Sequence, residues 1–166
     1  MSQKIKDCIL AIHESLNEAE KREQIKHFIN AVYLSPKLYV VLSEKFLNEE
    51  AGRSLAFLTK NREAHTGQCF LFSDLELAKA WARQHGHILN EKRYLIGELF
   101  KNDYDQFFKG IAIVGITHAL INEDFNGYGF KIEDLFSYAK IKPYTVEEFK
   151  KIDIYQHSPI FMKVLD

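Results

Sequence analysis

The chain has 166 residues, of which 46% are hydrophobic and 13% aromatic, a composition that indicates a folded globular protein and excludes an intrinsically disordered one. Its 22 basic and 23 acidic residues leave a formal net charge of -1, so no overall charge directs it to nucleic acid or to an anionic membrane surface. Cys8 and Cys69 are the only cysteines and form no CxxC pair, which favours two reduced, buried thiols.

The amino-terminal region predicts two helices. Apolar residues recur at helical spacing in the first segment: Ile5, Ile9, Ile12 and Leu16. A second helix is predicted over 19–34 and ends at Ser35-Pro36, because proline supplies no backbone donor and disfavours helix before it. Polar residues interrupt the first apolar series, so it lacks the continuous apolar segment of a signal peptide. The sequence never approaches the roughly 18 unbroken apolar residues of a membrane span, and we expect a cytoplasmic protein with no membrane partner.

Residues 37–72 predict a strand followed by a β-hairpin. The sequence KLYVVLS (37–43) is β-branched and aromatic, as in a buried strand. Two apolar segments, 55–59 and 69–72, flank the polar stretch 60–68, which is long for a tight turn and is expected to protrude.

The second hairpin strand leads directly into a predicted amphipathic helix. Ser73 and Glu76 stand three residues apart, which is the spacing of a capping box. This helix carries the only tryptophan, Trp81, and Gly86 is a natural carboxyl-terminal stop. Residues 93–100 are predicted to form a further helix.

The next part of the sequence predicts the central strand of the sheet. The segment GIAIVGIT (110–117) is apolar on both faces, as a central strand is. The residues that follow it, 118–125, either extend this strand across a bend or form its hairpin partner. The glycine-bearing stretch 126–130 predicts a turn, and 131–140 predicts an amphipathic helix.

The carboxyl-terminal part completes an α+β prediction. Thr145 and Glu148 repeat the capping-box spacing ahead of a short helix, and the apolar tail 152–166 predicts a docked edge strand. We expect an α+β fold in which helices pack on a mixed or antiparallel sheet of about five strands. No internal repeat or linker is present, so one domain over 1–166 is expected. Its parts are a helical amino terminus (1–35), a sheet core (37–140) and a carboxyl-terminal extension (141–166).

Candidate catalytic and metal-binding residues are few and scattered. His85 and His87 form an H-x-H pair, and His118 follows the predicted central strand. Four acidic residues could supply acid–base pairs: Asp103, Asp105, Glu123 and Asp124. The glycine loop lacks the Lys-Ser/Thr sequel of a phosphate loop, and no serine has a G-x-S-x-G context. We therefore expect no catalytic residue, no metal and no cofactor, with one enzyme alternative: a small metal-dependent or acid–base hydrolase built on His85, His87, His118 and Asp124.

Nucleic-acid binding is a second alternative. Basic residues cluster on the second predicted helix and in the hairpin turn: Lys21, Arg22, Lys26, Lys60 and Arg62. Acidic neighbours largely cancel their field: Glu18, Glu20, Glu23 and Glu63. We therefore disfavour nucleic acid as a partner.

Protein recognition has stronger support, because several aromatic residues lie in polar, loop-like contexts: Tyr104, Phe107, Phe108, Phe125, Tyr128, Phe130 and Tyr155. An aromatic side chain in a loop either fills the core of its own domain or anchors a partner. We predict that loops 60–68 and 123–130 form the partner surface. The candidate partner-binding residues are Arg62, Glu63, His65, Tyr104, Glu123, Asp124, Phe125 and Tyr128.

Three segments resemble the amino-terminal domain of the SseB family (enhanced serine sensitivity proteins). They are FINAVYLSPKLYVVL (28–42), LAFLTKN…GQCFLFSDLELAKAWA (55–82) and GIAIVGITHALINEDFNGYGFKIEDL (110–135). The resemblance covers roughly 25–136, is strongest between Phe72 and Ala82, and departs from the family at Glu123, which stands where proline usually follows the asparagine. It implies an α+β sheet domain without known catalytic residues, and similar small folds recur among bacterial immunity proteins.

The leading hypothesis is a non-catalytic, cytoplasmic protein-binding module, with immunity to a delivered toxin as its concrete form. The Lys-, Asn- and Phe-rich composition suggests a bacterial source. A steric inhibitor needs only a complementary surface, commonly about 800 Å² per partner. The partner is expected to be another protein, either a toxin domain or a second copy of this chain.

Overall fold

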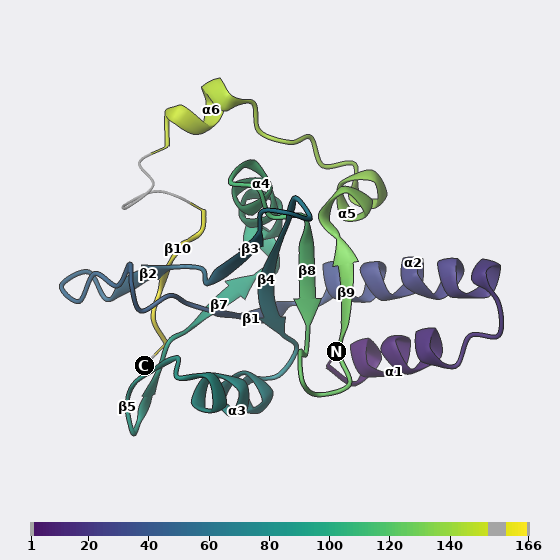
Figure 1. Ribbon diagram of the computed structural model, residues 1–166, viewed down its shortest axis with the longest axis horizontal. Coiled ribbons are helices and arrows are strands. Elements are labelled where there is room, and N and C mark those ends of the chain that lie inside the picture. Colours follow the sequence, from purple (N-terminus) through teal and green to yellow (C-terminus); the bar gives the residue numbers. More distant parts are fainter. Residues whose placement is uncertain (1, 153–158, 166) are drawn as a thin grey trace.

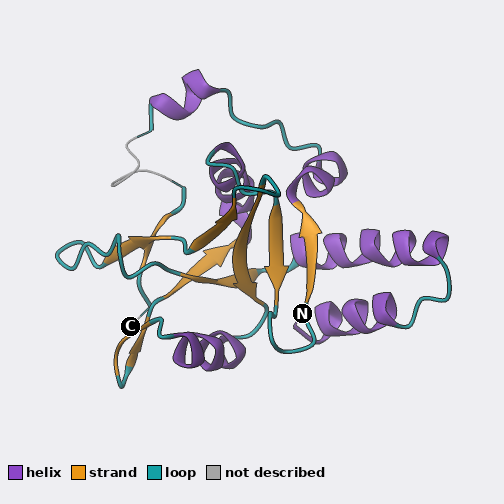
Figure 2. Ribbon diagram, viewed as in Figure 1, coloured by secondary structure: helices purple, strands orange, loops and turns teal. Residues whose placement is uncertain are grey.

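The computed structural model describes residues 2–152 and 159–165, and its centre is a mixed six-stranded sheet with helices on both faces (Figures 1 and 2). The helices are α1 (Ser2–His13), α2 (Glu18–Leu34), α3 (Leu75–His85), the 3-10 turn η1 (Lys101–Asp103), α4 (Tyr104–Ile113), α5 (Ile132–Ala139) and α6 (Val146–Lys150). The strands are β1 (Lys37–Val41), β2 (Arg53–Leu55), β3 (Leu58–Asn61), β4 (Thr66–Phe72), β5 (Ile88–Asn90), β6 (Arg93–Tyr94), β7 (Ile96–Phe100), β8 (His118–Ile121), β9 (Tyr128–Lys131) and β10 (Phe161–Lys163). These elements confirm the predicted α+β class, the mixed sheet and the helical amino terminus. Within the described ranges, none of the helices is both long and apolar enough to span a membrane.

Strand β4 is the centre of the sheet. In the order β7-β1-β4-β8-β9, neighbouring strands are antiparallel except for β4 and β8, which run parallel. Strand β3 forms the predicted hairpin with the amino-terminal half of β4, and the turn between them is 62–65, shorter than the predicted 60–68. Two small two-stranded sheets, β2–β10 and β5–β6, lie outside this sheet.

Alternation along the strands gives the sheet two buried faces. In β1, Leu38 and Val40 face the core that also holds α1, α2, α4 and α5, whereas Val41 faces α3. In β4, Leu71 faces the first core and Phe72 the second. Successive side chains of a strand point to opposite faces, so these neighbours separate as expected. Helix α3 therefore covers one face of the sheet, and α1, α2, α4 and α5 cover the other.

Helices α1 and α2 form the predicted helical amino terminus. Three of the four apolar residues predicted for the first helix are buried in it. The helix ends at His13, so Leu16 lies outside it and is 90% exposed. Helix α2 begins after Asn17, whose side chain accepts a hydrogen bond from the backbone N–H of Glu20.

The prediction of a helix over 93–100 is wrong, because this segment forms β6 and β7. Strand β7 pairs with β1 along its whole length, and an ion pair of 3.1 Å joins Lys37 to Glu98 across the two strands. A Cβ atom at Gly97 would lie 3.3 Å from the carbonyl oxygen of Lys163, so β10 passes closely over this strand. Non-local pairing thus outweighs the helix propensity of the leucine and glutamate residues.

The prediction of a central strand over 110–117 is also wrong. Helix α4 runs through this segment to Ile113 and buries Tyr104, Phe107 and Ile111, which recur at helical spacing. The apolar residues that suggested a strand with two buried faces are the last turn of this helix and the turn after it. The strand in this region is β8, and it pairs parallel with β4.

The carboxyl-terminal segment returns to the rest of the fold. Helix α6 has the predicted capping box between Thr145 and Glu148. Strand β10 pairs antiparallel with β2, with Phe161 opposite Leu55, which confirms a strand in the predicted tail. Residues 153–158 of that tail lie outside the described part of the chain.

Candidate functional site

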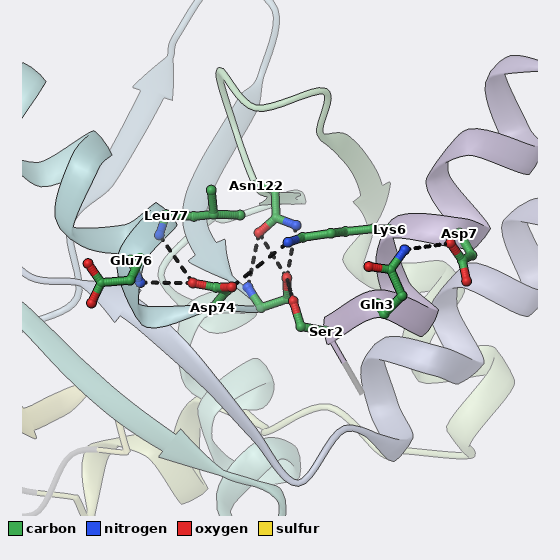
Figure 3. Close-up of polar contacts among 9 residues, drawn as sticks. Ser2, Gln3, Lys6, Asp7, Asp74, Glu76, Leu77 and Asn122 are labelled. Carbon is green, nitrogen blue, oxygen red and sulfur yellow. Dashed lines mark hydrogen bonds and ion pairs between the residues drawn. The ribbon is translucent and has the colours of Figure 1, made fainter.

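The candidate site lies at the carboxyl ends of β4 and β8. These strands are parallel neighbours, so Ser73 and Asp74 after β4 meet the loop 122–127 after β8 beyond the carboxyl ends of the two strands. Open α/β sheets bind their ligands at the carboxyl ends of parallel strands. The start of α1 lies beside it, because Ser2 contacts Ser73 (Figure 3).

Asn122 connects these segments. Its buried side chain accepts a hydrogen bond from the backbone N–H of Ser73 at 3.0 Å, and its amide group donates one to Ser73 Oγ at 2.9 Å. Ser73 Oγ also lies 3.0 Å from Ser2 Oγ. One buried amide and one hydroxyl therefore fix three segments that are far apart in the sequence.

Asp74, and not Ser73, caps α3. The Asp74 carboxylate accepts hydrogen bonds from the first turn, including the backbone N–H of Glu76 at 2.9 Å. The predicted capping box between Ser73 and Glu76 is therefore wrong, because the serine hydroxyl is engaged by Asn122. Lys6 Nζ of α1 lies 3.8 Å from Asp74 Oδ2, so a cation lies at the same end of the strands (Figure 3).

Loop 122–127 has a left-handed backbone at several positions. Three of its residues have φ between 53° and 68°: Asn122, Asp124 and Asn126. Asparagine and aspartate adopt this region more readily than other residues with a side chain. A Cβ atom at Gly127 would lie 2.2 Å from the carbonyl oxygen of Ile121, so only glycine fits there. Sequence and close packing together hold Glu123 and Phe125 in a defined conformation.

His85 and Asp124 form an ion pair that ties the end of α3 to this loop. His85 Nε2 lies 2.9 Å from Asp124 Oδ2, and the imidazole stacks on Trp81 with ring centroids 4.1 Å apart. Both side chains are well exposed to solvent, so their pairing contributes little to stability. Both groups remain accessible to a partner or substrate.

Two neighbouring groups have protonation equilibria shifted by burial. Burial raises the pKa of Glu123, and the charge of Asp124 adds to this shift while His85 opposes it. Burial lowers the pKa of His87, whose Nδ1 lies 3.1 Å from the carbonyl oxygen of Leu42. Both side chains therefore favour their neutral forms more strongly than they would in water.

A groove of about 570 Å³ lies between α1 and loop 122–127. It is lined by Lys6, Ile9, Leu10, His13, Phe125 and Asn126. Leu10 is 55% exposed in this groove, and Phe125 packs edge-on against Phe72 with ring centroids 6.4 Å apart. We call this region the loop–groove surface and define it by Lys6, Leu10, His13, Glu123, Asp124 and Phe125.

The eight predicted partner-binding residues do not form one surface. Three of them belong to the loop–groove surface: Glu123, Asp124 and Phe125. Three others are exposed at the amino-terminal end of β4, away from that surface: Arg62, Glu63 and His65. Tyr128 is half-buried at the start of β9 and packs edge-on against Phe28.

Tyr104 is buried and cannot contact a partner. It begins α4, and its hydroxyl donates a hydrogen bond of 2.6 Å to the carbonyl oxygen of Ser35. Three more of the aromatic residues that sequence context placed in loops are buried in the same core: Phe107, Phe108 and Phe130. Tyr155 lies outside the described residues.

The residues of the hydrolase alternative converge only in part. His85 and His87 both contact Trp81, and Asp124 joins His85. His118 begins β8 whereas Asp124 follows its end, so these two lie at opposite ends of the strand. In residues 2–152 and 159–165, no three His, Cys, Asp or Glu side chains are grouped to hold a metal ion. Within the same ranges, no serine, threonine or cysteine side chain is hydrogen-bonded to His85.

Sequence reasoning missed five residues of this site: Lys6, Leu10, His13, Ser73 and Asn122. Only Asn122 had a signal in the sequence, because NEDFNG combines four residues that tolerate a left-handed backbone or a tight turn directly after an apolar strand. Lys6 and Ser73 join the site through contacts between distant segments, which the local sequence does not encode.

Comparisons of the chain with protein-family models, with curated proteins and with solved structures give no match. The resemblance to the SseB family therefore stays a prediction. The geometry of the site, and not a relative, is the ground on which a function is inferred.

Proposed function

We propose that this chain is a non-catalytic protein-binding module of SseB-like type that acts in the bacterial cytoplasm, with a toxin that it blocks as its partner. The loop–groove surface carries this proposal. A loop held by Asn122 and Gly127 lies beside a groove in which Leu10 is exposed. A surface ordered before binding loses less conformational entropy when a partner docks.

The chemistry of this surface defines the partner that would fit it. Glu123 and Asp124 lie on the loop, and Asp74 and Glu76 lie at the adjacent start of α3. An apolar side chain would fill the groove beside Leu10, and lysine or arginine residues would meet Glu123. The other three carboxylates already lie beside cationic side chains: Asp74 beside Lys6, Glu76 beside Lys79 and Asp124 beside His85. We therefore expect a partner patch in which an aliphatic or aromatic anchor is flanked by basic residues.

The test compares surface variants with matched controls. Leu10→Asp and Glu123→Lys change the loop–groove surface, and Val146→Asp and Glu147→Lys make the same changes on exposed positions of α6. The tagged wild-type chain captures proteins from a bacterial lysate, and each captured protein is then purified and titrated with all five chains. We expect binding to weaken at least about tenfold in the first two variants and to stay unchanged in the controls. Equal binding by the wild type and Leu10→Asp, or no specific capture by the wild type, would refute the proposal.

The immunity form of the proposal has its own readout. When the captured protein is toxic in a bacterial host, co-expression of the wild-type chain is expected to restore growth. Leu10→Asp is expected to lose this protection, and Val146→Asp to retain it. Protection that is independent of the loop–groove surface would contradict the proposed mode of inhibition.

One observation favours the hydrolase alternative: His85 lies 2.9 Å from Asp124, as a general base lies beside the carboxylate that orients it. Purified protein can be assayed with p-nitrophenyl acetate and with bis(p-nitrophenyl) phosphate. An enzyme would lose its rate in His85→Gln, whereas a binding module gives the same background rate in both proteins.

A further inference from the structure

A second concave site lies between α4 and α5, at the opposite end of β8 from the loop–groove surface. The cavity measures about 470 Å³, within the size range of small-molecule sites in proteins. His118, the first residue of β8, lines it. Thr66 of β4 lies on the same lining, which places the cavity at the amino ends of the two parallel strands.

The walls of this cavity are mostly apolar. Ile113 and Phe136 are only half-buried there, and Pro143 is exposed on the lining. Apolar side chains left partly in contact with water gain free energy when an apolar body covers them. The cavity therefore favours a ligand that has an apolar body.

The polar groups on the lining carry a positive excess. Lys109 comes from α4 and Lys131 from the junction of β9 and α5, while Glu133 is the one carboxylate among the lining residues that the structure describes. In the described part of the chain, the ammonium group of Lys131 has no ion-pair or hydrogen-bond partner. Lys109 Nζ lies 5.1 Å from the ring centroid of Tyr144, which also lines the cavity. An anion could therefore bind Lys131 without breaking an existing ion pair.

The amino end of α5 adds no net charge to the lining. Its first backbone N–H, that of Ile132, donates a hydrogen bond of 2.8 Å to the carbonyl oxygen of Thr117. Glu133 and Asp134 lie in the first turn and offset the partial positive charge of a helix amino end. The positive charge at the cavity therefore comes from the two lysines.

We infer that this cavity binds a free small molecule with an apolar body and a single anionic head group, such as a carboxylate. The apolar body lies against Ile113 and Phe136, and the head group pairs with Lys109 and Lys131. This site lies on other elements than the loop–groove surface and does not depend on the proposed function.

Octanoate and octan-1-ol form a matched pair of probes, because they share an apolar chain and differ in charge. Each is titrated into ¹⁵N-labelled protein at low salt, and the amide signals of Ile113, Thr117 and Ile132 are followed by NMR. We expect saturable shifts of these signals, with octanoate binding about tenfold more tightly than octan-1-ol. In the double variant Lys109→Gln/Lys131→Gln, the affinity for octanoate is expected to fall to within about twofold of the affinity for octan-1-ol. Each exposed ion pair contributes up to about fivefold to the affinity.

Two further variants separate the apolar and charged contributions. Ile113→Asp is expected to abolish the shifts for both probes, since it places a charge on the apolar wall. Lys92→Gln removes a lysine at the β5–β6 turn, far from α5 (Figure 1), and is expected to bind octanoate like the wild type. The inference is overturned if the cavity amides do not shift, if both probes bind equally, or if the double lysine variant binds octanoate as the wild type does.

Discussion

Replacement of Asn122 tests whether one amide holds the candidate site together. In Asn122→Ala, the backbone N–H of Ser73 loses its acceptor in a part-buried hydrogen bond, which costs about 1–3 kcal/mol. Alanine must also adopt φ near 57°, which costs roughly 1 kcal/mol more than asparagine does. We therefore expect the free energy of unfolding to fall by about 3 kcal/mol, and the melting temperature by about 6–12 °C.

Urea unfolding measures this change, and Asn122→Gly provides the control for backbone strain. Glycine removes the same hydrogen bonds but tolerates the left-handed backbone, so we expect Asn122→Gly to lower the free energy of unfolding by about 2 kcal/mol. The m-value is expected to stay unchanged in both variants. A double-mutant cycle with Ser73→Ala is expected to give a coupling energy of about 1 kcal/mol for the two side chains. A loss below about 0.5 kcal/mol in Asn122→Ala would refute the hydrogen-bond explanation, and equal losses for alanine and glycine would refute the backbone explanation.

Four further predictions test other parts of the fold. Gly127→Ala is expected to cost about 3 kcal/mol or more in urea unfolding, because its Cβ atom would lie 2.2 Å from a carbonyl oxygen; a neutral effect would mean that the loop relaxes freely. Tyr104→Phe is expected to cost about 1–2 kcal/mol by leaving the buried carbonyl oxygen of Ser35 without its donor, and an unchanged melting temperature would count against this. Because the pKa of His87 is lowered in the native state, the unfolded chain binds more protons than the native state as the pH falls toward and below the ordinary value of 6.5, and the free energy of unfolding decreases. His87→Asn is expected to flatten this pH dependence of the free energy of unfolding between about pH 7.5 and 5.5. The same slope in the variant and the wild type would contradict the prediction. Burial raises the pKa of the Cys69 thiol far above its ordinary value, so iodoacetamide is expected to label Cys8 first and Cys69 only on unfolding, as mass spectrometry of labelled peptides would show.

Local sequence patterns predicted the helices better than they predicted the sheet. The periodicity of the first, second and fifth helices and the stop at Gly86 are properties of neighbouring residues, and the structure has them. The segment 93–100 was predicted as a helix and forms two strands, and the segment 110–117 was predicted as a strand and forms the end of α4 and the turn after it. Each is apolar enough for either structure, and the choice is decided by pairing with β1 in one case and by packing against the sheet in the other.

The candidate site was predictable only in its exposed loop. Glu123, Asp124 and Phe125 follow an apolar segment and precede an Asn-Gly pair, which is enough to place them in a turn. Tyr104 has a similarly polar context but begins a helix whose other face is apolar, so its ring enters the core. Whether an aromatic residue lies in a loop or in a core helix depends on whether apolar residues continue at helical spacing beyond the polar ones. In α4 they do continue, but Gly110 disfavours a helix in the local sequence.

The parallel pairing of β4 with β8 explains why one chain offers two separate surfaces. Its carboxyl end gathers the acidic loop, His85 and the start of α1, while its amino end opens into the cavity between α4 and α5. The two sites lie at opposite ends of β8, about a strand length apart, so the effects of variants on binding should add. If Lys131→Gln weakens capture of a protein partner as much as Leu10→Asp does, the two ends are coupled and the cavity belongs to the partner surface. If it changes only octanoate binding, the ends act independently, and the same sheet carries a protein-binding site and a small-molecule site.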